Sequence, residues 1–170
     1  KDNKSLRLRI ERNLDDRLEY LIVACADKIV VNTETHRREM MERHEKDIFV
    51  TVRNSFDKSD YDGIDGRRYD TFTVAHVGSM YGLRRPDVIL RAIKHLDQTR
   101  GSEQLRLQVL FVGLNEPHLV EMIKRYGLER YVKILPMVSH HEAIEIMVHS
   151  HLLLLIKATG PGSLGKIPGK

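Results

Sequence analysis

From residue 72 to residue 156 the sequence alternates between short apolar runs and amphipathic segments, and this alternation constrains the fold most. The apolar runs predict strands at 72–77, 105–112, 131–135 and 151–156. Helical signals lie between them, at 86–96, 117–126 and 139–149. Pro86 suits a first turn, Gly127 closes a last turn, and Ser139 opens a capping box of the form S-x-x-E. Alternating strands and helices predict an α/β fold with a parallel sheet covered on both faces.

The N-terminal part shows the same alternation in shorter form. Residues 5–26 predict an amphipathic helix, whose apolar stripe includes Leu14, Leu18 and Cys25. The next predicted elements are a strand at 28–32, a helix at 33–44 that Thr33 caps, and a strand at 48–52. Residues 54–70 are rich in Asp and Gly and have no periodicity, which indicates a loop or linker.

Composition places the chain among globular proteins. It has 170 residues, of which 41% are hydrophobic and 31% charged, so neither a disordered nor a fibrous protein fits. The longest apolar run, 152–156, is far shorter than the roughly 20 residues that a membrane helix needs. The single cysteine, Cys25, provides neither a disulfide nor a zinc cluster, and this suits a reducing compartment.

The net charge of +4 raises the question of nucleic-acid binding. Residues 1–46 mix basic and acidic side chains in alternating order, which is typical of a solvated helix surface and not of a basic stripe. After Glu145 the sequence has no acidic residue, and Lys157, Lys166 and Lys170 lie in or beside a Gly- and Pro-rich stretch. This pattern favours a local anion site the size of one phosphate group, and no nucleic-acid partner is expected.

Ligands of doubly wound sheets bind beyond the carboxyl ends of the strands. Three such ends are rich in glycine here, at 78–82, 113–115 and 160–169. Gly160 to Lys166 approximates a phosphate-binding P-loop, but Ile167 stands where a hydroxyl must bind magnesium, so a P-loop nucleotide binder is disfavoured. The loop at 78–82 also lacks the dinucleotide pattern G-x-G-x-x-G. Arg84 and Arg85 follow that loop and are placed either for phosphate contact or on the solvated surface.

Other chemistry-bearing residues favour structural roles. Four of the nine histidines lie in or beside the helix predicted at 139–149, without metal-ligand spacing. After His141 and Glu142, the zinc pattern H-E-x-x-H lacks its second histidine, so surface or capping roles are favoured. Cys25 lies on an apolar stripe without a nearby histidine, which predicts a buried and inert thiol. The Asp-x-Asp at 60–62 is ordinary turn chemistry.

Several short motifs follow one another in a recognisable order. They are A-D-K-I-V-V-N-T at 26–33, N-S-F-D at 54–57, V-G-S-M-Y-G-L-R at 77–84, L-F-V-G at 110–113, V-K-I-L-P at 132–136, S-H-H-E at 139–142, and the apolar run 152–156 followed by 160–170. This order resembles the retaining glycosyltransferases of the group 1, family 4-like kind, which have the glycosyltransferase-B fold. The resemblance covers nearly the whole chain.

That family has two Rossmann-like three-layer α/β/α domains with mostly parallel sheets, and the C-terminal domain holds most of the nucleotide-sugar donor. The resemblance therefore implies a partial glycosyltransferase-B architecture. Residues 1–58 match the last helix, strand, helix and strand of the acceptor-side domain, 59–70 a linker, and 71–170 the first half of the donor domain. Ser55 stands where the family has glycine, and the family's second lysine after the arginine has no clear match.

The resemblance also implies roles for individual residues. The residues expected to bind the donor diphosphate are Gly78, Arg84, Lys166 and Lys170. Backbone contacts to the base are expected from Pro136, Met137 and Val138, and further loop positions of the site are Gly113, Gly160 and Gly162. No residue is identified as a catalytic acid, base or nucleophile. No metal or other cofactor is expected, because arginine, lysine and helix N-termini stabilise the departing diphosphate in this fold.

The implied reaction is a hexosyl transfer from a nucleotide-diphosphate sugar to an acceptor hydroxyl with retention, in polysaccharide or glycoconjugate biosynthesis. The expected acceptor is a glycan or a lipid-linked molecule, and the expected location is the cytoplasm, with peripheral association of the parent enzyme at the inner face of the membrane. The loop-like end at Lys170 predicts a fragment that is inactive alone. The alternative is a non-catalytic Rossmann-like nucleotide-binding or interaction module.

Overall fold

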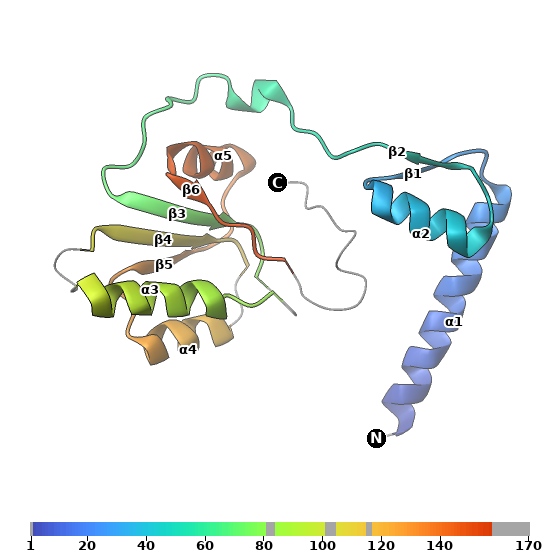
Figure 1. Cartoon of the computed structure of the whole chain (residues 1–170), viewed down its shortest axis with the longest axis horizontal. Helices are drawn as coiled ribbons and strands as arrows, with labels where there is room; N and C mark the ends of the chain where they lie inside the picture. The colour runs from blue at the N-terminus through green and yellow to red at the C-terminus, as the bar shows by residue number, and fades with distance from the viewer. Residues whose placement is uncertain (1, 81–83, 101–104, 115–116, 158–170) are drawn as a thin grey trace. The chain divides into compact units, whose positions relative to one another are not determined.

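The computed structural model describes residues 2–80, 84–100, 105–114 and 117–157. These residues form two compact units, the first ending at Phe56 and the second beginning at Asp57 (Figure 1). Each unit has a parallel sheet of its own.

The first unit is a short helix–strand–helix–strand repeat. Its elements are α1 (Asp2–Cys25), β1 (Ile29–Val31), α2 (Glu34–His44) and β2 (Phe49–Thr51). The predicted N-cap is confirmed, because the Thr33 side chain accepts a hydrogen bond from the backbone N–H of His36 at 3.1 Å. β1 and β2 pair in parallel, and their inner face packs with α1 and α2 around a core of Val23, Val31 and Phe49.

The apolar stripe of α1 is exposed. Leu14, Leu18 and Leu21 are each more than half exposed, whereas Val23 on another side of the helix is buried in the core of the unit. The prediction of a buried thiol is therefore wrong, since Cys25 is exposed. The helical periodicity is correct, but periodicity alone does not determine which side of a helix is covered.

The second unit contains a four-stranded parallel sheet with the order β5-β4-β3-β6. Its elements are η1 (Lys58–Tyr61), β3 (Phe72–Val77), α3 (Asp87–Arg100), β4 (Leu107–Val112), α4 (Pro117–Tyr126), β5 (Val132–Leu135), α5 (His140–His149) and β6 (Leu152–Leu153). The strands run parallel because each connection between them passes through a helix.

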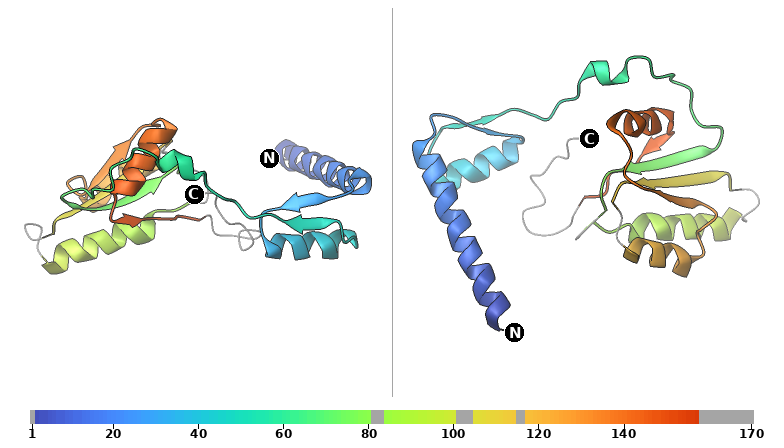
Figure 2. Two further views of the ribbon diagram at one scale, coloured as in Figure 1. Left: turned by 90° about the horizontal axis from the view of Figure 1, so that it is seen from above. Right: turned by 180° about the vertical axis from the view of Figure 1, so that it is seen from behind.

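Both faces of this sheet are covered. One face packs under α3 and α4 around Leu90, Phe111 and Leu119, and the other packs Ala75 and Leu110 against α5 and the segment before β3. Figure 2 shows α5 on the face opposite to α3 and α4. Alternate strand residues supply the two cores, as the pleat requires. The predicted three-layer α/β/α fold is confirmed.

The segment between η1 and β3 lies against α5. Near the start of the helix, His140 Nε2 is 3.1 Å from a carboxylate oxygen of Asp60. At its end, the Arg68 guanidinium donates to the backbone carbonyls of Val148 and Ser150, and the Tyr69 N–H donates to His149 at 3.0 Å. Burial, with a smaller contribution from Glu145, raises the pKa of the Tyr69 phenol. The residues expected to form a linker at 59–70 are therefore bonded to the second unit, and the assignment of domains stays a prediction.

Candidate functional site

Two glycines bring the carboxyl ends of β3 and β4 into close contact. Gly78 and Gly113 follow these strands with φ angles of 132° and 124°, a region that favours glycine. A Cβ on Gly113 would lie 2.9 Å from the carbonyl carbon of Gly78, so no side chain fits there. The Gly78 N–H donates to Val112, and the Gly113 N–H donates to Leu135 at the end of β5. Gly78 and Gly113 thus form a surface of backbone groups at the ends of β3 and β4, bonded to the end of β5, which we call the glycine floor.

Arg84 and Arg85 have different environments, although they are adjacent in the sequence. Arg84 is half-buried, and its guanidinium donates to the backbone carbonyl of Ser79 at 2.8 Å, which holds the side chain at the loop after β3. Arg85 is exposed and pairs with Asp87 at 3.1 Å, and this hydrogen bond lowers the pKa of the Asp87 carboxyl. Of the two arginines, Arg84 is therefore the better candidate for an anion at the glycine floor.

The residues expected to contact a base follow β5. Pro136 and Met137 are exposed, whereas Val138 packs partly into the core on the α5 side of the sheet.

The predicted capping box, which begins at Ser139, is confirmed. The Ser139 N–H donates to the Glu142 carboxylate at 2.8 Å, and the Glu142 N–H donates to the Ser139 hydroxyl at 3.2 Å. The hydrogen bond from the Ser139 side chain lowers the pKa of Glu142. The box fixes the turn that presents residues 136–138.

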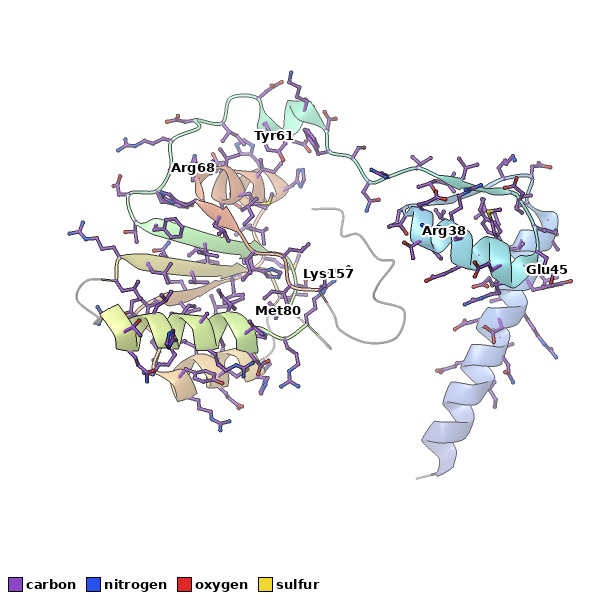
Figure 3. The ribbon with its side chains drawn as sticks, in the orientation of Figure 1. Arg38, Glu45, Tyr61, Arg68, Met80 and Lys157 are labelled. Atoms are coloured by element: carbon purple, nitrogen blue, oxygen red, sulfur yellow. The ribbon has the colours of Figure 1, made fainter. Side chains whose placement is uncertain are left out.

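The structure brings part of the predicted set together. Gly78, Gly113 and Arg84 lie at the carboxyl ends of β3 and β4, and 136–138 follow the adjacent strand β5. Figure 3 places Met80 and Lys157 at the same end of the sheet. The remaining predicted positions lie outside the described residues: Gly160, Gly162, Lys166 and Lys170.

Within the residues that the structure describes, no group of three or more His, Cys, Asp or Glu side chains could hold a metal ion. His149 instead donates from Nε2 to the backbone carbonyl of Asp65 at 2.9 Å. No helix within the same residues is long and apolar enough to cross a membrane.

One buried polar residue near the site, His76, is not among the site residues predicted from the sequence. His76 is 1% exposed in β3, two residues before Gly78, and its Nδ1 lies 2.9 Å from the carbonyl oxygen of Leu154. The sequence does contain one indication of its importance: an ionisable residue lies inside a run predicted to be a buried strand, where polar groups need hydrogen-bond partners.

Known proteins resemble this chain at low sequence identity. No family model matches. A D-inositol 3-phosphate glycosyltransferase of Kineococcus radiotolerans is 25% identical over 158 residues, with 78% of this chain and 36% of the relative covered. An enzyme of the same name from Salinispora arenicola is 28% identical over 141 residues, with 69% and 32% covered. The chain thus spans about a third of the length of these curated relatives.

Solved structures extend the likeness to the backbone. The pneumococcal O-GlcNAc transferase GtfA with UDP and GlcNAc matches with a TM-score of 0.66 at 15% identity, over 84% of this chain and 28% of that one. Anabaena HepE with UDP and glucose matches with a TM-score of 0.61 at 18% identity, over 88% and 43%. The fold is that of the glycosyltransferase-B enzymes. A mutant of S. aureus TarM in complex with UDP agrees, with a TM-score of 0.64 at 14% identity over 81% and 27%.

Proposed function

We propose that this chain is part of a retaining glycosyltransferase and that its second unit binds the diphosphate of a nucleotide-sugar donor. The observation that carries the proposal is the floor formed by Gly78 and Gly113, with the Arg84 guanidinium held at the neighbouring loop. The relatives carry glycosyltransferase names, and two of the similar structures contain UDP together with a sugar, which supports this choice of ligand.

The geometry suits a diphosphate for two physical reasons. A floor without side chains allows phosphate oxygens to approach the backbone closely, which is the usual function of glycine at such strand ends. A guanidinium forms charge-assisted hydrogen bonds to phosphate that are about twice as strong as neutral ones. Arg84 reaches the loop after β3 and so can contribute such bonds at the floor.

The remaining parts of the proposal rest on the family resemblance. Pro136, Met137 and Val138 would contact the base, and Gly160, Gly162, Lys166 and Lys170 would complete the diphosphate site. The donor sugar would pass with retention to a glycan or lipid-linked hydroxyl during polysaccharide or glycoconjugate synthesis, without a metal ion. Positive groups would stabilise the charge that develops on the leaving diphosphate.

Calorimetric titration with UDP tests the proposal. Arg84→Ala should weaken UDP binding about tenfold or more, because a charge-assisted contact is lost. Arg84→Lys should give an intermediate affinity, since lysine keeps the charge but lacks the planar fork. Arg85→Ala is the matched control and should bind as the unsubstituted chain does, because Arg85 pairs with Asp87 at the surface. Equal affinities for the Arg84→Ala and Arg85→Ala variants would contradict the role of Arg84.

A further inference from the structure

His76 is a buried imidazole in a strand whose neighbours are mostly apolar. It is 1% exposed, lies opposite Phe111 in the register of β3 with β4, and has its ring 6.0 Å from the Phe111 ring between centroids. An aliphatic side chain would fill this position without the desolvation cost of a polar ring. Packing alone therefore does not account for a histidine at position 76.

The imidazole makes a hydrogen bond to a distant part of the chain. Its Nδ1 lies 2.9 Å from the carbonyl oxygen of Leu154. Because a carbonyl oxygen can only accept, the proton of this bond is on Nδ1. The bond joins β3 to the segment that follows β6.

This bond lies where the backbone pairing of β6 stops. β6 pairs with β3 only at Leu152 and Leu153, and the Leu154 N–H donates to Ala75 at 2.8 Å. The carbonyl of Leu154 then accepts from His76. Both backbone groups of Leu154 are thus held by β3, one by its main chain and one by a side chain. The direction in which the chain leaves the sheet is fixed at Leu154.

We propose that His76 is a positioning residue of the donor site, acting through Leu154. This inference rests on the proposed function. His76 lies two residues before Gly78, and Lys157 follows Leu154 by three residues. Figure 3 places Lys157 at the end of the sheet where Met80 of the loop after β3 also lies. By holding the Leu154 carbonyl, His76 directs residues 154–157, and the cation of Lys157, toward the end of the sheet that carries the glycine floor.

Hydrogen exchange and UDP titration on the full chain test this inference with three variants. His76→Phe removes the donor and keeps a ring. His76→Asn keeps an N–H donor at the position of Nδ1, since both nitrogens are bonded to Cγ. Thr73→Val is the matched control: it removes a buried hydrogen bond of the same strand, from the Thr73 hydroxyl to Thr71, away from the site.

The expected results separate positioning from stability. His76→Phe should speed exchange of the Leu154 amide, whose N–H is bonded to Ala75 at the same point of the chain, and should weaken UDP binding, each about tenfold, because one hydrogen bond is lost. His76→Asn should restore both, whereas Thr73→Val should lower the melting temperature and leave UDP affinity unchanged. Unchanged exchange in His76→Phe, or equal losses in His76→Phe and His76→Asn, would overturn the inference. Absence of UDP binding by the unsubstituted chain would contradict the proposed function, while the exchange measurements would still report on the His76 bond.

Discussion

At the scale of single residues, the glycines that follow strands were the most predictable part of the site. A glycine directly after a buried strand indicates a backbone conformation that other residues adopt poorly, and Gly78 and Gly113 both have positive φ angles. The distinction between Arg84 and Arg85 was not predictable. Both residues follow the same loop, and only the folded backbone shows that Arg84 bonds to Ser79 while Arg85 pairs with Asp87.

Gly113→Ala should lower the free energy of unfolding by about 3 kcal/mol, because a strained φ and a backbone clash add. Its new Cβ would lie 2.9 Å from the carbonyl carbon of Gly78. Two control variants grade the effect by chemical denaturation. Gly127→Ala also has a positive φ but open space, and should cost about 1 kcal/mol. Gly66→Ala has neither problem and should change little. Equal stabilities of the Gly113 and Gly127 variants would refute the close approach.

At the scale of elements, the sequence predicts the helix caps and most strand ends, but not the length of the last strand. Local side chains determine a cap, as Thr33 and Ser139 show. A strand ends where its pairing ends, and this depends on distant residues. The apolar run 151–156 predicts a six-residue strand, yet β6 comprises only Leu152 and Leu153, because pairing with β3 stops there. The sequence shows the apolar run, but it does not show how many of its residues pair with β3.

Ser139→Ala should destabilise the second unit by about 1 kcal/mol, the usual cost of losing an N-cap side chain. The hydroxyl is lost as acceptor for the Glu142 N–H and as donor to the Glu142 carboxylate. Ser139→Asp keeps a capping acceptor and is the matched control, although it loses the hydroxyl proton and places two carboxylates together. Denaturant unfolding should rank the three chains with alanine as the least stable. An alanine variant as stable as the original would show that the cap contributes nothing.

The same capping box predicts a pH dependence. Because the folded-state pKa of Glu142 lies below its usual 4.5, the carboxylate stabilises the folded state above that pH, and this contribution is lost as the pH falls through the lowered pKa. Glu142→Gln keeps a capping side chain without the charge. The stability difference between the two chains should therefore be constant near neutral pH and shrink below 4.5. If the stability difference between the original chain and the Glu142→Gln variant grew on acidification, the lowered pKa of Glu142 would be contradicted.

At the scale of the whole molecule, the sequence predicted the class of fold and not the order of its strands. Alternation of strands and helices is sufficient for a parallel α/β sheet, but the order β5-β4-β3-β6 requires pairings between residues far apart in the chain. The exposure of Cys25 was not predictable for a similar reason, because it depends on which side of α1 packs into the core of its unit.

The two units have separate cores, so core truncations should act locally. Phe49→Ala should lower the stability of the first unit by about 3 to 5 kcal/mol, and Leu128→Ala that of the second by about 2 to 5 kcal/mol. Residue-resolved hydrogen exchange should show each variant loosening only its own unit. Exchange that accelerates throughout both units in either variant would show a single cooperative core instead.

Amide chemical-shift mapping during a UDP titration tests most directly the proposal that the second unit binds a nucleotide diphosphate at the glycine floor. The expected shifts are largest at Gly78, Ser79 and Gly113, with further changes from residue 136 to residue 138, and they saturate with UDP. Residues of the first unit's core, such as Val31 and Phe49, serve as the internal reference and should not shift. Saturable shifts confined to other surfaces, or no shifts at all, would contradict the claim.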